Sequence, residues 1–131
     1  IMKKHNGVMW KNLEADDVLG IMATEPHPTE DRIIVSIDKD MKQIPTKLSR
    51  DGETVEEIPE RLANYWFMIQ TLAGDSTDGY SGLPNVGEKT AENIIYNRNK
   101  LGRYNSVEDI MLVPGIWSKT YENISPLIRI N

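Results

Sequence analysis

The chain carries seven carboxylates in three short clusters whose spacing suits divalent metal ions. The first cluster lies in NLEADDVLG, the second follows the β-branched run RIIVSI, and the third lies in AGDSTDG. Carboxylate oxygens are hard ligands of the kind that Mg²⁺ and Mn²⁺ prefer. If the clusters converged without cations, each close pair would cost on the order of 4 kcal/mol at 4 Å and an effective dielectric of 20. The candidate metal ligands are Glu14, Asp16, Asp17, Asp38, Asp40, Asp75 and Asp78.

Each cluster also has a purely structural explanation. Acids in the first turn of a helix interact favourably with its dipole, an aspartate after a strand often caps a helix, and acids beside glycines are common in turns. The spacing favours a shared metal site. The first and third clusters place acids three residues apart, as on one helical turn, and the second places them two apart, as on one side of an extended strand.

The elements that would position these clusters are those of an α/β fold. Asn12 is predicted to cap a helix that begins near Leu13. Residues 32–37 have apolar side chains on both faces, which is typical of a buried parallel strand that ends at the second cluster. The other predicted elements of this part are strands over residues 44–48 and 53–58, a hairpin turn at Asp51 and Gly52, and a helix from Pro59 to about Ala73.

An internal repeat follows the third cluster. LPNVGEKTAENI (83–94) aligns with VPGIWSKTYENI (113–124), and the Pro, Lys, Thr, Glu, Asn and final Ile are identical. Between the two copies, residues 97–105 are expected to form a turn. Ser106 is then expected to cap a short helix, with Asp109 at the capping-box position.

Each copy of the repeat has the pattern of a hairpin between two helices. Such a hairpin presents backbone N–H groups to a phosphate, so its contacts carry no base-sequence information. Gly87 keeps the second glycine position of the first copy, whereas Trp117 replaces it in the second and would crowd a phosphate there. The alternative is a plain helical hairpin punctuated by Pro and Gly. The DNA-binding candidates are Asn85, Val86, Gly87, Lys89 and Thr90 in the first copy and Gly115 and Lys119 in the second.

Composition is compatible with a partner that is a polyanion. Residues 1–81 hold 9 basic and 15 acidic side chains, whereas residues 82–131 hold 6 and 5, so the acidity lies where the clusters lie. Two divalent cations would offset four of those charges. The chain has no cysteine, and no apolar run approaches the ~18 residues of a membrane span. We expect a cytoplasmic protein with no membrane partner, and an internal cut at Ile1.

These motifs together resemble the 5′-nuclease superfamily, which includes flap endonucleases, the 5′-nuclease domains of bacterial DNA polymerases and phage 5′→3′ exonucleases. The matching segments are LEADDVLG (13–20), VSIDKDMKQI (35–44) and LAGDSTDGYSGLPNVGEKTAENI (72–94), in the order of the family. After Ile95, the chain is similar to the tandem helix–hairpin–helix domains of bacterial competence DNA receptors.

The resemblance implies an incomplete 5′-nuclease, PIN-like α/β core over residues 1–81 and an all-α tandem helix–hairpin–helix region over residues 82–131. It also implies two Mg²⁺ or Mn²⁺ ions, one activating water and one stabilising the leaving 3′ oxygen of a DNA phosphodiester. Asp17, Asp38 and Asp75 are the candidate catalytic residues. The implied substrate is a duplex with a 5′ end, flap or nick, and the implied ion at the first hairpin is K⁺.

The chain departs from the family pattern before Glu14, where it has neither the first-strand aspartate nor the basic helical arch. We therefore expect an upstream segment or a second chain to complete the sheet, and little cleavage by these residues alone. The rival interpretations are a non-catalytic DNA-binding module and a structural domain that binds a partner chain.

Overall fold

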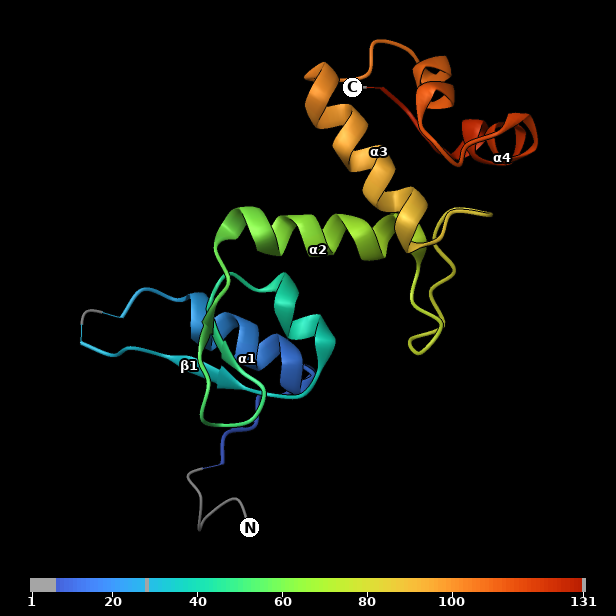
Figure 1. Cartoon of the computed structure of the whole chain (residues 1–131). Coiled ribbons are helices and arrows are strands. Elements are labelled where there is room, and N and C mark those ends of the chain that lie inside the picture. Colours follow the sequence, from blue (N-terminus) through green and yellow to red (C-terminus); the bar gives the residue numbers. More distant parts are fainter. Residues whose placement is uncertain (1–6, 28, 131) are drawn as a thin grey trace. The chain divides into compact units, whose positions relative to one another are not determined.

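The computed structural model describes residues 7–27 and 29–130. It divides into two compact units, residues 1–64 and residues 65–131, and the boundary falls inside one helix, α2 (Glu60–Ala73) (Figure 1). The described residues are rich in helix and form one small sheet, which agrees with an α/β part followed by a helical part. The functional division predicted at residues 81 and 82 is a different boundary and stays a prediction.

The first unit contains a three-stranded sheet. Its strands are β1 (Ile33–Val35), β2 (Lys47–Ser49) and β3 (Glu56–Glu57), in the order β1-β2-β3. β1 pairs with β2 in parallel and β2 pairs with β3 in antiparallel orientation. The parallel pair and the returning strand are therefore confirmed, although each strand is shorter than predicted.

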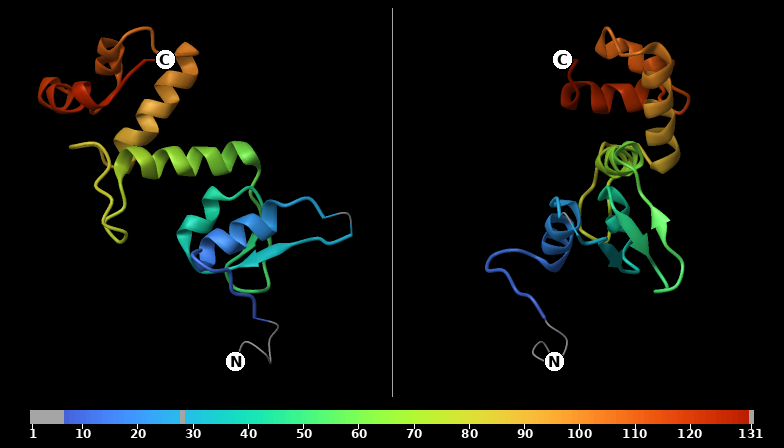
Figure 2. Two further views of the ribbon diagram at one scale, coloured as in Figure 1. Left: turned by 180° about the vertical axis from the view of Figure 1, so that it is seen from behind. Right: turned by 90° about the vertical axis from the view of Figure 1, so that its left-hand side faces the viewer.

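One face of this sheet carries the core of the first unit. Ile34 and Leu48 are buried there together with Met41 of η2 (Lys39–Gln43), and Ala23 of α1 (Ala15–Thr24) packs against them. Figure 2 shows α1 beside the sheet in both of its views. The opposite side of β1 is exposed, since Ile33 is 44% and Val35 64% exposed, whereas Ser49, beside Val35 on β2, is buried. The prediction that this strand is buried on both faces is wrong within the described residues.

The start of α1 also differs from the prediction. Asn12 has a positive φ of 65° and lies in the turn before the helix, so it does not cap it. Glu14 is the N-cap, and it forms a reciprocal capping box with Asp17. An N-cap residue normally has an extended backbone, whereas Asn12 is left-handed. The helix therefore begins two residues later, with Glu14 as its cap.

The turn between β2 and β3 is held by Asp51. Its carboxylate accepts hydrogen bonds from the N–H groups of Thr54 (2.8 Å) and Glu53 (2.9 Å), and the Ser49 hydroxyl donates to it (3.2 Å). Mainly through the two backbone bonds, the pKa of Asp51 is lowered to about 2. Gly52 follows with a φ of 82°, which glycine adopts readily. The predicted hairpin turn is confirmed.

Asp51 should make the first unit less stable at low pH. Because its folded pKa is depressed, its contribution is complete above the unfolded pKa of about 4 and is lost as pH falls toward about 2. We expect Asp51→Ala to lower the free energy of unfolding at neutral pH, and the deficit to shrink between about pH 4 and pH 2. Urea titrations across this range measure it, and parallel curves for the two proteins would contradict it.

The second unit is helical. Its elements are the C-terminal part of α2, α3 (Glu88–Leu101), η3 (Val107–Leu112), α4 (Ser118–Ile124) and η4 (Ser125–Leu127). Nine buried side chains form its core, and Figure 2 shows η3 and α4 beside α3 in both views. The core residues are Ile69, Val86, Ala91, Ile94, Ile95, Ile110, Val113, Ile116 and Ile124.

Two details of this unit bear on the predictions. The capping box of Ser106 and Asp109 is present, and the N–H groups of Asn105 and Ser106 lower the pKa of Asp109 by donating to its carboxylate. The turn predicted over residues 97–105 is shorter, because α3 continues to Leu101 and ends at Gly102. Among the described residues, no helix combines the length and apolar character needed to cross a membrane.

Candidate metal and nucleic-acid site

The first acidic cluster lies at the N-terminus of α1, and its three side chains are exposed. The Asp17 carboxylate accepts a hydrogen bond from the Glu14 N–H (3.2 Å), and the Asp16 carboxylate accepts one from the Asp17 N–H (3.0 Å). These bonds satisfy N–H groups that a helix start leaves unpaired, so the cluster has a structural role whether or not it binds metal.

The second cluster follows β1. Asp38 is the N-cap of η2, and its carboxylate accepts a hydrogen bond from the Asp40 N–H at 2.9 Å. Asp38 is exposed and Asp40 is half-buried. The extended geometry predicted for this pair is wrong, because the chain enters η2 immediately after Asp38.

The third cluster lies in a tight loop of the second unit. Asp75 is only 6% exposed, and its two carboxylate oxygens accept hydrogen bonds from Gln70 Nε2 (2.9 Å) and the Thr77 N–H (2.8 Å). Asp78 is exposed, and one of its carboxylate oxygens lies within 4.8 Å of one of Asp75. Two negative charges this close repel each other, and a hard cation bound to both carboxylates would relieve the repulsion.

The backbone of this loop differs from the helical turn that was predicted. Asp75 and Tyr80 exchange backbone hydrogen bonds of 2.6 and 2.8 Å, and the Leu83 N–H donates to the Leu72 carbonyl at 2.8 Å. Gly74 (φ 83°) and Gly82 (φ 60°) lie where the two ends of the loop touch. The loop is therefore closed on itself, and a shallow pocket of about 420 Å³ adjoins it.

The seven carboxylates belong to both units, with five in residues 1–64 and two in residues 65–131. Their convergence into one shell, and the catalytic roles of Asp17, Asp38 and Asp75, stay predictions.

The first hairpin is a tight turn that leads into α3. The Val86 N–H donates to the Leu83 carbonyl at 3.1 Å, and Asn85 takes the left-handed position with a φ of 60°. Val86 is buried and anchors the turn in the core. Gly87 is the N-cap of α3 and makes no side-chain cap, so the first N–H groups of this helix have no capping side chain at that position. A Cβ added at Gly87 would meet no atom within 4 Å.

The second hairpin repeats the same backbone thirty residues later. The Ile116 N–H donates to the Val113 carbonyl at 3.1 Å, and Gly115 takes the left-handed position with a φ of 98°. Trp117 is the N-cap of α4, and its φ and ψ of −100° and 169° are close to the −91° and 178° of Gly87. The predicted repeat is therefore a structural repeat.

Two of the predicted DNA-binding residues have a role in packing one copy of the repeat against the other. A Cβ at Gly115 would lie 3.0 Å from Thr90 Oγ1, and Asn93 Nδ2 donates to the Pro114 carbonyl at 3.0 Å. The second hairpin thus packs against the first turns of α3. Gly115 and Thr90 have this packing role, and their contact with DNA stays a prediction.

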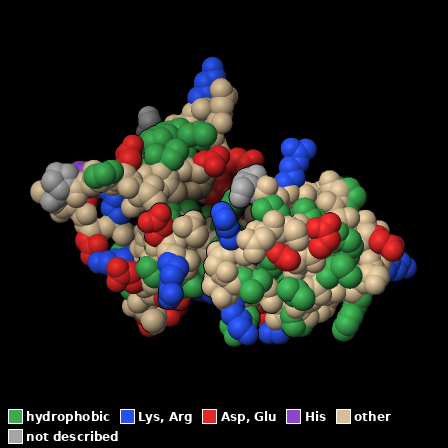
Figure 3. Space-filling view, turned by 90° about the horizontal axis from the view of Figure 1, so that it is seen from above, with side chains coloured by type: hydrophobic (Ala, Val, Ile, Leu, Met, Phe, Trp, Pro, Cys, Tyr) green, Lys and Arg blue, Asp and Glu red, His purple; other side chains and the backbone are tan. Residues whose placement is uncertain are grey.

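The basic residues of the hairpins are at the surface. The Lys89 side chain is 83% exposed and forms an ion pair with Glu92 at 3.0 Å, and this carboxylate raises the pKa of Lys89. Lys119 is also exposed. On the face seen in Figure 3, the Lys and Arg side chains lie as separate spots rather than as one continuous stripe.

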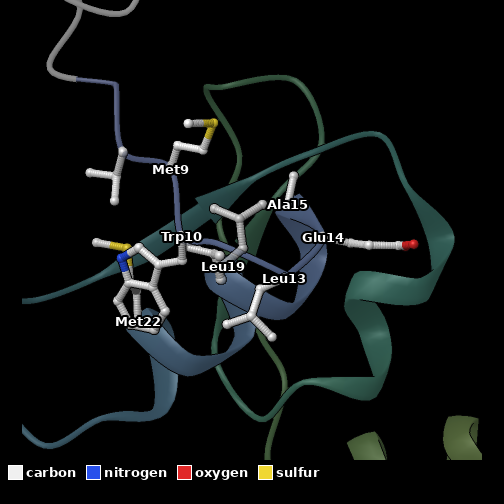
Figure 4. A pocket seen from close by; sticks show the side chains of 9 residues that line it. Met9, Trp10, Leu13, Glu14, Ala15, Leu19 and Met22 are labelled. Atoms are coloured by element: carbon white, nitrogen blue, oxygen red, sulfur yellow. The ribbon is translucent and has the colours of Figure 1, made fainter.

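Two features were not predicted. Gln70 and the Thr77 N–H orient the Asp75 carboxylate, and only the loop geometry reveals them. The other is an apolar pocket of about 430 Å³ beside α1. Figure 4 shows Met9, Trp10 and Leu19 along it, with Glu14 pointing away from them. Nothing among the described residues identifies what would occupy this pocket.

Comparison with known proteins gives a consistent set of relatives. Residues 80–129 match the family model of the helix–hairpin–helix motif. An exodeoxyribonuclease of Enterobacteria phage T3 is 41% identical over 88 residues, which cover 63% of this chain and 28% of that protein. A 5′–3′ exonuclease of Buchnera aphidicola is 33% identical over 114 residues, covering 78% of this chain and 40% of that protein.

A DNA polymerase I of Lactococcus lactis is 31% identical over 131 residues, covering 86% of this chain and 14% of that protein. The chain therefore spans less than half the length of each of these three relatives.

Proposed function

Because the chain is related to the C-terminal region of the 5′-nuclease superfamily, we propose that it is the metal- and duplex-binding part of a 5′→3′ exonuclease or flap endonuclease. Its substrate is DNA with a 5′ end, a flap or a nick. The observation that carries this proposal is the first hairpin. Its turn leads into the start of α3, where the N-cap is a glycine and no N-cap side chain occupies the N–H groups that could bind a phosphate. Since the chain spans less than half of each relative, hydrolysis is proposed for the whole protein.

The proposed metal ligands are the carboxylates of the three clusters. Gln70 and the Thr77 N–H fix Asp75, and exposed Asp78 and Asp38 offer further oxygens. Two Mg²⁺ or Mn²⁺ ions would bind Glu14, Asp16, Asp17, Asp38, Asp40, Asp75 and Asp78, and would supply an activated water and stabilisation of the leaving 3′ oxygen.

The proposed fold of residues 1–81 is part of a PIN-like core, and that of residues 82–131 a tandem helix–hairpin–helix region. The parallel pairing of β1 with β2 and the position of Asp38 after β1 support the first assignment. β1 is an edge strand of the described sheet, and Ile33 and Val35 within it and Ile37 just after it are exposed. A further strand, from a longer protein or a second chain, would pair with this edge.

The proposed duplex contact is made by the backbone around Asn85 and Gly87, with Lys89 beside it and K⁺ as the proposed ion of the turn. Backbone contacts to phosphate give no base preference. The affinity should therefore be independent of sequence, and few charges should give a shallow log–log salt dependence, with a slope of about −1 to −3.

Gly87→Ser should separate DNA binding from stability. Serine is a good N-cap that accepts a hydrogen bond from the helix start, so the variant should be at least as stable as the wild type. The same hydroxyl competes with phosphate for these N–H groups, so affinity for a blunt duplex should fall about tenfold, as expected for loss of a charge-assisted bond. Fluorescence anisotropy and thermal unfolding measure the two effects.

Trp117→Ser is the matched control, since it makes the same cap at the start of α4. We expect it to leave blunt-duplex affinity unchanged. Equal losses from both variants would mean that both hairpins hold the duplex, and an unchanged Gly87→Ser would refute the hairpin contact.

A non-catalytic DNA-binding module is the second candidate, and the two intact turns over residues 83–86 and 113–116 favour it. The discriminating measurement incubates a 5′-flap and a nicked duplex with the chain and Mn²⁺, with Asp38→Asn as the control. We expect cleavage near background from this chain alone and restored cleavage when the upstream segment is added, whereas no restoration would favour the module. Robust cleavage that Asp38→Asn abolishes would make the chain an active nuclease by itself and exclude the module.

A further inference from the structure

Trp117 occupies the place in the second hairpin that Gly87 occupies in the first. The two residues have the same position in the repeat, the same extended backbone and the same role as N-cap. In both copies the N-cap carbonyl accepts a hydrogen bond of 2.9 Å from the N–H four residues later. The direction in which a Cβ would leave the backbone at Gly87 is therefore also the direction of the Trp117 side chain.

The indole of Trp117 points into solvent. At Gly87 a Cβ would meet no atom within 4 Å, and Trp117 is 75% exposed. By contrast, Trp10 is 38% exposed, and Trp66 is half-buried with its ring 5.4 Å from that of Tyr65. Trp117 therefore buries little surface in the fold, whereas a tryptophan side chain usually stabilises a fold by being largely buried.

The chemistry of the indole restricts what it can bind. Its bulk prevents the close backbone approach of a phosphate that a glycine permits. Its flat face suits another π system, and stacking on a nucleobase is tolerant of sequence because every base has such a face. Bases inside a duplex already stack on both of their neighbours, whereas an unpaired base at an end, gap or flap can turn a free face toward the indole.

We propose that Trp117 is a base-stacking residue that binds an unpaired nucleobase beside the duplex held by the first hairpin. The proposal rests on the proposed function, since it assumes that the first hairpin holds duplex DNA. It adds to that function the residue that would recognise the unpaired part of such a substrate. The exposed side chain of Lys119, two residues later, supplies positive charge for the adjoining backbone.

The test compares a blunt duplex with the same duplex carrying a short unpaired thymidine overhang. The wild type should bind the overhang duplex at least about fivefold more tightly, as expected for one stacked base. Trp117→Ala should bind both duplexes alike, Trp117→Phe should retain part of the preference, and none of the variants should change binding of the blunt duplex. Because Trp117 is exposed, Trp117→Ala should unfold at the wild-type midpoint.

A second readout follows the indole itself. In a Trp10→Phe, Trp66→Phe background, Trp117 is the sole tryptophan, and its emission should be quenched by the overhang duplex and not by the blunt one. Equal wild-type affinity for both duplexes would overturn the proposal and leave the proposed function intact. Absence of binding to either duplex would instead refute the proposed function. Self-association that Trp117→Ala abolishes, without any overhang preference, would also overturn it.

Discussion

Gly82→Ala should remove most of the stability of the second unit. A Cβ at Gly82 would lie 2.4 Å from the Gly74 nitrogen and 2.5 Å from the Ala73 carbonyl carbon. Both atoms belong to the backbone, so no side chain can move away to make room. Gly82 also has a φ of 60°, which costs about 1–2 kcal/mol for an L residue. The combined loss in free energy of unfolding should exceed about 4 kcal/mol, which is exceptional for one methyl group.

Gly79→Ala is the matched control in the same loop. Gly79 has a φ of 71°, yet a Cβ there meets no atom within 4 Å. It should therefore cost only the conformational part, about 1–2 kcal/mol. Urea denaturation followed by circular dichroism measures both variants, and equal losses would mean that the ends of the loop do not touch as the structure has them.

The closed loop explains why the site was only partly predictable from sequence. The helix that ends at Ala73 follows from Pro59 and the apolar spacing, and the repeat follows from six identical residues, so both could be predicted. The contact of Gly74 with Gly82 is made between residues eight positions apart. No local pattern specifies it, because AGDSTDG is equally compatible with a helical turn.

Long-range packing also explains why two predictions for the first unit failed. Residues 32–37 have the composition of a strand buried on both faces, and their parallel pairing is confirmed. Burial depends on what covers the second face, and none of the described residues bury Val35 or Ile37 there. Similarly, the left-handed Asn12 moves the helix start to Glu14, and a propensity for capping cannot reveal such a reversal.

The second large effect is that divalent cation should stabilise the chain through Asp75. Asp75 and Asp78 repel each other in the loop, and a cation that binds only the folded state relieves this repulsion. With Mg²⁺ at a hundred times its dissociation constant, the gain is about 2.7 kcal/mol. Thermal unfolding at increasing Mg²⁺ or Mn²⁺ concentrations should show a rising midpoint.

Asp75→Asn should abolish most of this rise without weakening the metal-free protein. The asparagine oxygen can still accept from the Thr77 N–H, and the Gln70 amide can turn to accept from the new amide group. Removing one of two neighbouring charges should even raise the metal-free midpoint slightly.

Asp109→Asn is the matched control, because Asp109 is also a carboxylate of the second unit that accepts backbone hydrogen bonds. It lies in a capping box rather than beside a second loop carboxylate, so its removal should lower the midpoint and leave the response to Mg²⁺ unchanged. An equal Mg²⁺ response in wild type and Asp75→Asn would place any bound cation elsewhere and remove Asp75 from the proposed site. If both variants lost the response, the stabilisation by Mg²⁺ would depend on the total negative charge of the second unit and not on a site at Asp75.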